Sequence, residues 1–271
     1  MAVKGHFMFS GAPRVGAFLL PLIDSRGLRW YHGAVKFRLF WVEHMETRLR
    51  PGLTGNQLKI LALIAMTCDH VGLELLPGSA LLRIIGRLAF PIFAYMVAEG
   101  CRYTHSRGKY LGKMAGMAAL CQVVYYLVSG SLYQCIFVTF TLSICLIYAL
   151  EAHRGAALGA LAAVCFACGV LPQLLSGTDF AVDYGLWGVL LPVMVYCGET
   201  KGQKLALLTL GLCLLGLTYG GIQWFGLFAV PLLALYNGQR GKWRIGGLFY
   251  FYYPAHLAVI YGIALLLRRP V

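Results

Sequence analysis

The side chains best suited to chemistry in this sequence stand inside apolar segments. Asp69 and His70 are neighbours in NQLKILALIAMTCDHVGLELL, and Glu74 follows one helical turn later. An imidazole exchanges protons near neutral pH, and a carboxylate beside it can orient it. Ionisable groups are costly in a membrane span and usually mark a functional site. We therefore predict a polar site here, the alternative being a polar pair that only holds helices together.

A second apolar segment carries two cations. Arg83 and Arg87 are four residues apart in LLRIIGRLAFPIFAYMVAEG and so share one face of a helix. Arg83 can extend to the membrane surface. Arg87 lies deeper and needs a partner, for which Asp69 and Asp183 are candidates. Pro91, four residues after Arg87, leaves the Arg87 carbonyl without its helical donor and predicts a bend in the helix.

Three further segments carry isolated ionisable groups. Asp183, followed by Tyr184, opens AVDYGLWGVLLP, where it either caps the helix or faces a cavity. His256 follows five consecutive aromatic residues in LFYFYYPAHLAVIYG and is either a site residue or a hydrogen-bonded core histidine. Glu99 is a candidate for substrate binding, although Arg102 three residues later favours a structural clamp. No two of His70, His256, Asp69 and Asp183 are three or four residues apart on one helix. A zinc site would therefore require tertiary assembly, and we predict none.

Composition places these groups in a membrane protein. Of the 271 residues, 59% are hydrophobic and 12% charged, and the mean hydropathy is +0.72. Soluble domains carry about 45 to 50% apolar and about 25% charged residues. The formal net charge of +13 then indicates basic cytoplasmic loops, not nucleic-acid binding.

From Asn56 onward we predict an all-α, polytopic bundle of about nine transmembrane helices. Lys and Arg occupy every second connection, which places the N-terminus in the cytoplasm and the C-terminus outside. The predicted spans are 56–76, 80–101, 110–128, 133–150, 155–175, 181–197, 203–218, 220–236 and 245–267.

The first 53 residues form a separate basic segment. Its longest apolar run, Val15 to Ile23, is too short to span a bilayer. The segment either lies on the cytoplasmic face or precedes a true start at Met45, which opens METRLRPGLTGNQLKI. The second interpretation is favoured. Residues 54–271 form the transmembrane domain.

Several motifs together resemble one known family. The sequence resembles the TraX family of conjugative F-pilin acetylases over about residues 54 to 265, with the motifs in the same order. The motifs are DHVG, RIIGRLAFPIFAYMVAEGCRYT, KYL, FTL, DYGLWGVLL, LYNGQRG and YYPAHL.

The resemblance implies a multi-pass acetyltransferase of the bacterial inner membrane. It would move an acetyl group from acetyl-CoA to an amine acceptor such as a pilin-like N-terminus. His70 would be the general base, oriented by Asp69, and Arg87, with Arg83, would stabilise the negative oxygen of the intermediate. His256 is the second candidate for the base, or an acetyl relay.

The resemblance also implies two groups of binding residues. A buried funnel should lead from the cytoplasmic side to His70. Arg83, Glu99, Asp183 and Tyr184 would contact the acceptor. The phosphates of CoA would meet the basic loop residues Arg102, Arg107, Lys109, Lys113, Arg240, Lys242 and Arg244.

Three other functions are alternatives for this sequence. A proton-coupled transporter could use Asp69, His70 and Asp183 as a relay, but we find no inverted repeats in support of it. A membrane O-acyltransferase acting on a surface glycan would need the same base and donor with a hydroxyl acceptor. A purely structural partner of a pilus or secretion assembly would leave Asp69, His70 and Arg87 unexplained.

Overall fold

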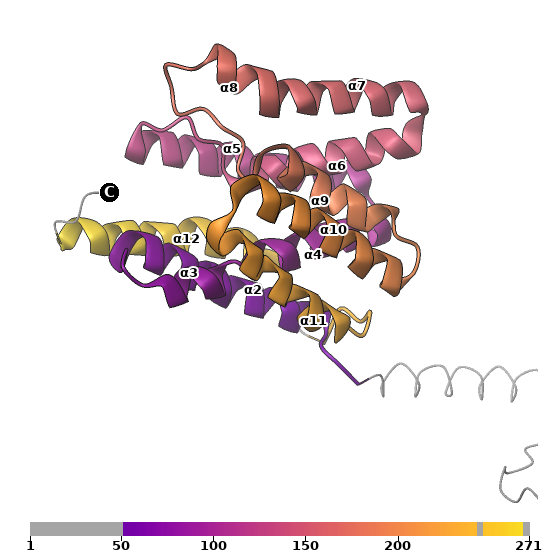
Figure 1. The fold of residues 1–271 in the computed structure, drawn as a ribbon, viewed down its shortest axis with the longest axis horizontal. Coiled ribbons are helices and arrows are strands. Elements are labelled where there is room, and N and C mark those ends of the chain that lie inside the picture. Colours follow the sequence, from indigo (N-terminus) through magenta and orange to yellow (C-terminus); the bar gives the residue numbers. More distant parts are fainter. Residues whose placement is uncertain (1–50, 243–245, 268–271) are drawn as a thin grey trace, which may run out of the picture. The chain divides into compact units, whose positions relative to one another are not determined.

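A computed structural model describes residues 51–242 and 246–267 of the chain. Most of the predicted basic segment 1–53, including Met45, lies outside these residues. The described residues form helices, with two isolated β-bridges and no strand. The predicted all-α class is confirmed for this part of the chain (Figure 1).

The helices follow the nine predicted apolar segments, and four of those segments are built from more than one helical piece. In chain order the elements are α2 (Gly55–His70), η1 (Val71–Leu75), α3 (Ala80–Gly86), α4 (Ala89–Tyr103), α5 (Arg107–Ser129), α6 (Ile136–Ala152), α7 (Arg154–Cys165), η2 (Phe166–Val170), α8 (Leu171–Leu174), α9 (Gly185–Cys197), α10 (Lys201–Tyr219), η3 (Gly221–Phe228), α11 (Ala229–Ala234) and α12 (Gly246–Leu266).

Local sequence fixes several of these ends. Thr54 and Gln57 form a capping box at the start of α2, and Thr200 and Gln203 form one at the start of α10. Gly130 ends α5 in the left-handed conformation, which costs glycine little. Within the described residues, three helical stretches are long and apolar enough to cross a membrane, namely Ala80–Tyr103, Arg154–Leu174 and Lys201–Tyr219.

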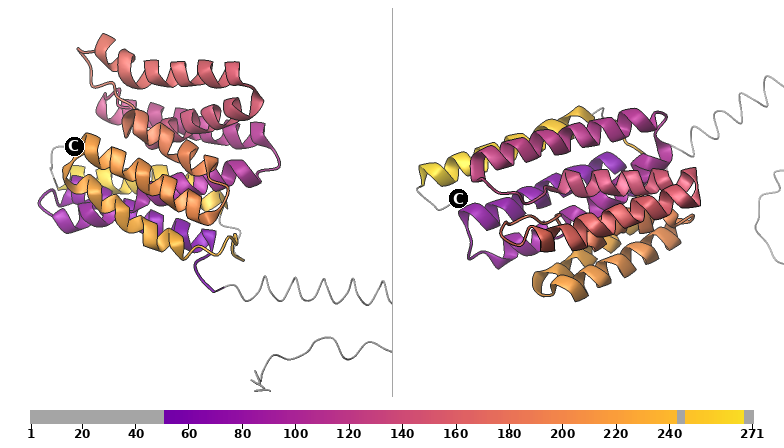
Figure 2. Two further views of the ribbon diagram at one scale, coloured as in Figure 1. Left: turned by 45° about the vertical axis from the view of Figure 1, so that its right-hand side comes forward. Right: turned by 90° about the horizontal axis from the view of Figure 1, so that it is seen from above.

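The predicted basic connections lie together at one end of the bundle. Arg102 Nη2 donates to the carbonyl oxygens of Tyr196 (2.5 Å) and Gly198 (2.9 Å), which joins α4 to the end of α9. Arg107 pairs with Glu151 at 2.6 Å, which joins the start of α5 to the end of α6. Antiparallel helices thus bring these segments to one end, as the views in Figure 2 show.

The opposite end is held by a different set of contacts. Asp179 accepts the backbone N–H of Leu132 at 2.8 Å and the hydroxyl of Ser131. Gln134 bridges to Val182 in the same pair of connections. These contacts fix the segment before α6 against the segment before α9, and both segments contribute to the site described below.

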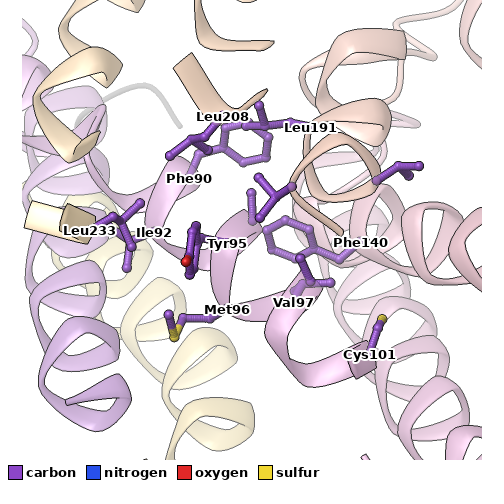
Figure 3. Packing of buried hydrophobic residues seen from close by; sticks show 14 of the residues in the cluster. Phe90, Ile92, Tyr95, Met96, Val97, Cys101, Phe140, Leu191, Leu208 and Leu233 are labelled. Atoms are coloured by element: carbon purple, nitrogen blue, oxygen red, sulfur yellow. The ribbon is translucent and has the colours of Figure 1, made fainter. Parts of the chain in front are cut away.

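The core lies around α4, which packs against α2, α6, α9, α10 and α11. One buried ion pair crosses it, between Lys204 Nζ of α10 and Glu99 Oε1 of α4 at 2.5 Å. Buried apolar side chains from seven helices meet there (Figure 3), including Phe90, Ile92, Tyr95, Phe140, Leu191, Leu208 and Leu233. This packing fixes α4 and the residues that precede it.

Candidate functional site

The site forms where two helical segments depart from α-helix geometry. α2 ends at His70 and continues as the π-helix η1, a local widening that often occurs at functional sites. α3 ends at Gly86 and α4 begins at Ala89, so Arg87 lies in the turn between them. Pro91 accounts for this break because it cannot donate to the Arg87 carbonyl.

Gly86 brings the two broken segments close together. A Cβ atom on Gly86 would lie 2.3 Å from Asp69 Oδ1, so only glycine lets the Asp69 carboxylate rest against α3. In that position the carboxylate meets both predicted cations. Arg87 Nη2 donates to Asp69 Oδ1 and Oδ2 at 2.5 Å each, and Arg83 Nη1 lies 2.9 Å from Oδ1. Of the two predicted candidates, Asp69 and Asp183, Asp69 is therefore the one that pairs with Arg87.

The donors of Arg87 are fully engaged. Besides Asp69, its Nε donates to the Arg83 carbonyl oxygen at 3.4 Å. Its Nη1 donates to Tyr184 Oη at 3.4 Å and to Gln223 Oε1 at 3.2 Å. A guanidinium has five N–H groups, and these contacts use all of them. In this arrangement Arg87 holds protein groups in position, and its predicted role as a donor to a reaction intermediate stays a prediction.

Arg83 suits that role better. Its side chain is 24% exposed and lines the same cavity as Asp69. Among the described residues, its only hydrogen-bonding contacts are made by Nη1, to the Asp69 carboxylate and to the Asp69 carbonyl oxygen at 3.3 Å. Nη2 is therefore available to a negatively charged oxygen in the cavity.

His70 forms a pair with His256. Nδ1 of His70 lies 3.0 Å from the Met66 carbonyl oxygen and 3.1 Å from Nε2 of His256. Nδ1 of His256 lies 3.0 Å from the Tyr252 carbonyl oxygen. Because a carbonyl oxygen only accepts, we assign the proton of each neutral ring to Nδ1. Nε2 of His256 then accepts from His70, and Nε2 of His70 keeps its lone pair.

This arrangement corrects the predicted orientation of His70 by Asp69. Successive residues of an α-helix point about 100° apart, so neighbouring side chains do not face each other. Asp69 turns to the arginines and His70 turns to α12. The imidazole is oriented by Met66 and His256 instead. His256 itself stacks on the ring of Tyr252 with a centroid distance of 5.3 Å.

These groups line a cavity of about 680 Å³, which we call the polar cavity. Asp183 also lines the cavity, and it accepts a hydrogen bond from the hydroxyl of Tyr133 at 2.8 Å. Of its two predicted placements, a helix cap or a cavity wall, the structure shows the cavity wall. The polar or ionisable residues of the lining are Asp69, His70, Glu74, Arg83, Arg87, Tyr125, Tyr133, Asp183, Tyr184, Tyr219, Gln223, Tyr253 and Tyr261.

A second cavity, of about 1030 Å³, opens toward the basic end, and we call it the basic cavity. Three predicted donor-binding residues, Lys109, Lys113 and Arg240, line it together with Lys59 and His105. Its deeper wall is apolar and methionine-rich, with Met66, Met96, Met114 and Met117. It reaches Met66, whose carbonyl oxygen contacts His70, and it adjoins the polar cavity because the two share lining residues. The predicted funnel from the basic end to His70 stays a prediction.

Other predicted binding residues lie elsewhere. Glu99 lines neither cavity and pairs with Lys204 rather than Arg102, because its side chain faces α10. Arg102 binds carbonyl groups at the end of α9, and Arg107 pairs with Glu151. Lys242 lines neither cavity. The predicted residue Arg244 lies outside the described residues.

Sequence reasoning missed Gln223, Tyr133, Tyr253 and Lys59. Gln223 is an amide inside the apolar run GGIQWFG, a signal of the same kind as the buried charges. Lys59, in NQLKIL, carried the same signal. Tyr133 and Tyr253 gave none, because tyrosines are common in membrane spans and only packing selects these two.

The fold and the site together define a class: an all-helical protein with long apolar helices around a polar cavity that holds a histidine pair and an arginine–carboxylate cluster. The family model described as TraX protein matches residues 54–264. The chain therefore belongs to the TraX family, and the predicted resemblance is confirmed.

Two relatives cover most of the chain. It is 27% identical over 248 residues to a probable fimbrial assembly protein FimC, serogroup H1, of Dichelobacter nodosus, covering 78% of this chain and 96% of the relative. It is 25% identical over 225 residues to Protein TraX of Escherichia coli, covering 77% and 86%. A Rickettsia prowazekii protein is 58% identical over 38 residues. No solved structure matches the chain.

Proposed function

We propose that this protein is an integral membrane acetyltransferase that moves an acetyl group from acetyl-CoA to an amine. The observation that carries the proposal is that His70, held through Nδ1 by Met66 and His256, lines the polar cavity together with Arg83, next to a basic cavity. With the proton assigned to Nδ1, Nε2 is left to accept a proton. A general base and a cationic donor to oxygen are the two groups that acyl transfer requires.

The membrane arrangement is part of the proposal. We infer nine membrane crossings, with the basic end of the bundle in the cytoplasm and the protein in the bacterial inner membrane. The clustering of Arg102, Arg107 and Lys201 at that end supports this orientation, because cytoplasmic connections carry the excess of Lys and Arg. Among the described residues, helices α6, α9, η3–α11 and part of α12 are shorter apolar helices that this arrangement would also place in the membrane.

The basic cavity is suited to an acetyl-CoA donor. Lys109, Lys113 and Arg240 supply positive charge for phosphates, and the methionine-rich wall suits an uncharged, flexible arm. The arm would point toward His70, since Met66 belongs to both the cavity wall and the contacts of that imidazole. Among the described residues, Arg102, Arg107 and Lys242 are not part of this subsite.

Three residues at the polar cavity have different roles in the proposed reaction. Nε2 of His70 takes the proton that the amine nitrogen loses as it bonds to the acetyl carbon. His256 stabilises the resulting imidazolium by accepting from Nδ1. Arg83 donates to the acetyl oxygen while it carries negative charge. The carbon–sulfur bond then breaks, and the proton held by His70 passes to the leaving thiolate.

The acceptor is proposed to be a pilin-like N-terminus. Its support is the name of one relative, a probable fimbrial assembly protein, and the family to which the chain belongs. The polar cavity has the groups to receive an amine, because Asp183 and Glu74 supply carboxylates.

Release of free CoA from acetyl-CoA tests the proposal. The full chain in nanodiscs should release thiol, and the rate should rise with a peptide that has a free N-terminal amine. His70→Ala should lower the rate by at least about 100-fold, the contribution expected of a general base. His153→Asn is the matched control, because it removes an exposed imidazole yet keeps an acceptor that caps α7.

Two outcomes would contradict the proposal. An unchanged rate in His70→Ala would remove His70 as the base and point to His256. If the wild type released no thiol with the peptide and acetyl-CoA did not raise its melting temperature, the acetyltransferase would be rejected in favour of a transporter.

A further inference from the structure

The polar cavity and the basic cavity meet at two side chains. Of the described residues that line either cavity, Ile136 and Tyr253 alone line both. Ile136 is the first residue of α6, and Tyr253 lies within α12. Because they border both cavities, a group that moves directly from one cavity to the other would pass these two side chains, and we call this pair the neck.

Packing holds both sides of the neck in place. The ring of Tyr253 stands edge-on against Phe137, with a centroid distance of 4.8 Å and an interplanar angle of 86°. The start of α6 is anchored because the backbone N–H of Cys135 donates to Gln122 Oε1 at 3.1 Å. These contacts hold the ring of Tyr253 and the backbone at the start of α6, so a wider group at the neck has to displace packed neighbours.

The neck also lies beside the proposed base. The ring centroids of Tyr253 and His70 are 6.5 Å apart, and the rings are nearly perpendicular. His256 lies 5.4 Å from Tyr253 in a similar edge arrangement. An acyl group that enters the polar cavity through the neck therefore arrives next to the histidine pair.

We propose that Ile136 and Tyr253 limit the length of the acyl group that this protein transfers. The inference rests on the proposed acetyltransferase function and adds its donor specificity. Acetyl passes the neck, whereas each added methylene has to displace one of two packed side chains. One methylene in a shaped apolar site changes specificity by about 10- to 200-fold.

The bonds made and broken are the same for every acyl group. The amine nitrogen bonds to the acyl carbon, the carbon–sulfur bond breaks, and the amine proton reaches the thiolate by way of His70. The neck decides only which acyl group reaches that step, so its effect appears in a ratio of rates.

The test compares acetyl-, propionyl- and butyryl-CoA with the full chain in nanodiscs and the peptide acceptor. The wild type should prefer acetyl to butyryl by at least about 100-fold in kcat/KM. Ile136→Ala should reduce this preference by about tenfold or more, and Ile136→Val by less. Tyr253→Phe should keep the preference, because it removes the hydroxyl and leaves the ring.

Ile222→Ala is the matched control, since Ile222 lines the polar cavity but not the basic cavity. It should leave the acetyl-to-butyryl ratio unchanged. Thermal unfolding should first show that the wild type and the two Ile136 variants are folded. If their acetyl-to-butyryl ratios of kcat/KM were then equal, the role of the neck would be rejected, whereas the proposed transferase would not. A wild type that turns over none of the three thioesters would overturn both.

Discussion

At the scale of single residues, Arg87 organises the polar site because all of its N–H groups donate to other groups of the protein. It joins Asp69, Tyr184 and Gln223, which belong to α2, the start of α9 and η3. The arginine thus ties three segments together around the polar cavity. Its neighbour Arg83 keeps a free nitrogen, so two arginines one turn apart serve different purposes.

We expect Arg87→Gln to destabilise the protein by about 3 kcal/mol, because removal of this partner leaves the half-buried Asp69 carboxylate with Arg83 as its remaining cation. Thermal unfolding in detergent measures the loss. Arg83→Gln should cost less, since its side chain is more exposed (24% against 10%). The double variant Asp69→Asn with Arg87→Gln should recover part of the loss. A single Arg87→Gln variant as stable as the wild type would rule out this role.

The histidine pair allows a second prediction at this scale. Replacing His256 by Phe keeps a ring of similar size but removes the nitrogen that accepts from His70. We expect kcat for acetyl transfer to fall by about tenfold or more, while the KM for acetyl-CoA stays near that of the wild type. Steady-state rates with varied acetyl-CoA separate the two constants. A change confined to KM would place His256 in donor binding instead.

At the scale of elements, the site depends on two interrupted helices that lie against each other. The π-helix η1 follows His70, and the turn at Arg87 precedes α4. At these interruptions Asp69 of the first segment faces Arg83 and Arg87 of the second. The absence of a side chain at Gly86 allows α2 and α3 to approach closely.

Gly86→Ala should therefore lower both the melting temperature and the transfer rate. Its methyl group would overlap the Asp69 carboxylate and push α3 away from α2. Gly78→Ala is the matched control, because nothing lies within 4 Å of its added carbon. The melting temperature of Gly78→Ala should stay at or above the wild-type value. If Gly86→Ala and Gly78→Ala had the same melting temperature, the close approach of α2 and α3 at Gly86 would be contradicted.

The connections before α6 and α9 give a pH-dependent prediction. Hydrogen bonds from the Ser131 hydroxyl and the Leu132 N–H lower the pKa of Asp179 below its usual 3.8. A lowered folded pKa stabilises the protein above pH 3.8, and this contribution is lost as the pH falls through the folded value. Asp179→Ala should lower the melting temperature at pH 7 and differ less from the wild type at lower pH. A difference in melting temperature that is the same at pH 7 and at low pH would contradict this role of Asp179.

At the scale of the whole molecule, two cavities open from opposite parts of the bundle and meet beside His70. Gly112 and Gly116 of α5 line the basic cavity, and nothing lies within 4 Å of the carbon that a side chain would add there. The bundle therefore leaves room along α5 for the proposed donor.

Gly116→Leu should fill that room and raise the KM for acetyl-CoA by about tenfold or more. The melting temperature should not fall, because leucine favours helix over glycine by roughly 0.8 kcal/mol. Gly159→Leu on α7 is the matched control, since Gly159 is equally open and lines neither cavity. An unchanged KM in Gly116→Leu would place the donor elsewhere.

The sequence by itself determined the helical class, the nine apolar segments and the TraX family, because apolar run length, breaks and motif order are local properties of the chain. It also identified Asp69, His70, Arg83, Arg87, Asp183 and His256, since a buried ionisable group is conspicuous among apolar neighbours.

Only the tertiary structure decided which of these groups meet. It turned Asp69 to the arginines and His70 to α12, it paired Glu99 with Lys204, and it placed Tyr253 between the two cavities. Partners 18 to 186 residues apart are chosen by how helices pack, and no periodicity within one segment encodes that choice. The physical reason is that a residue's type limits its chemistry, whereas the direction of its side chain depends on the neighbouring helices.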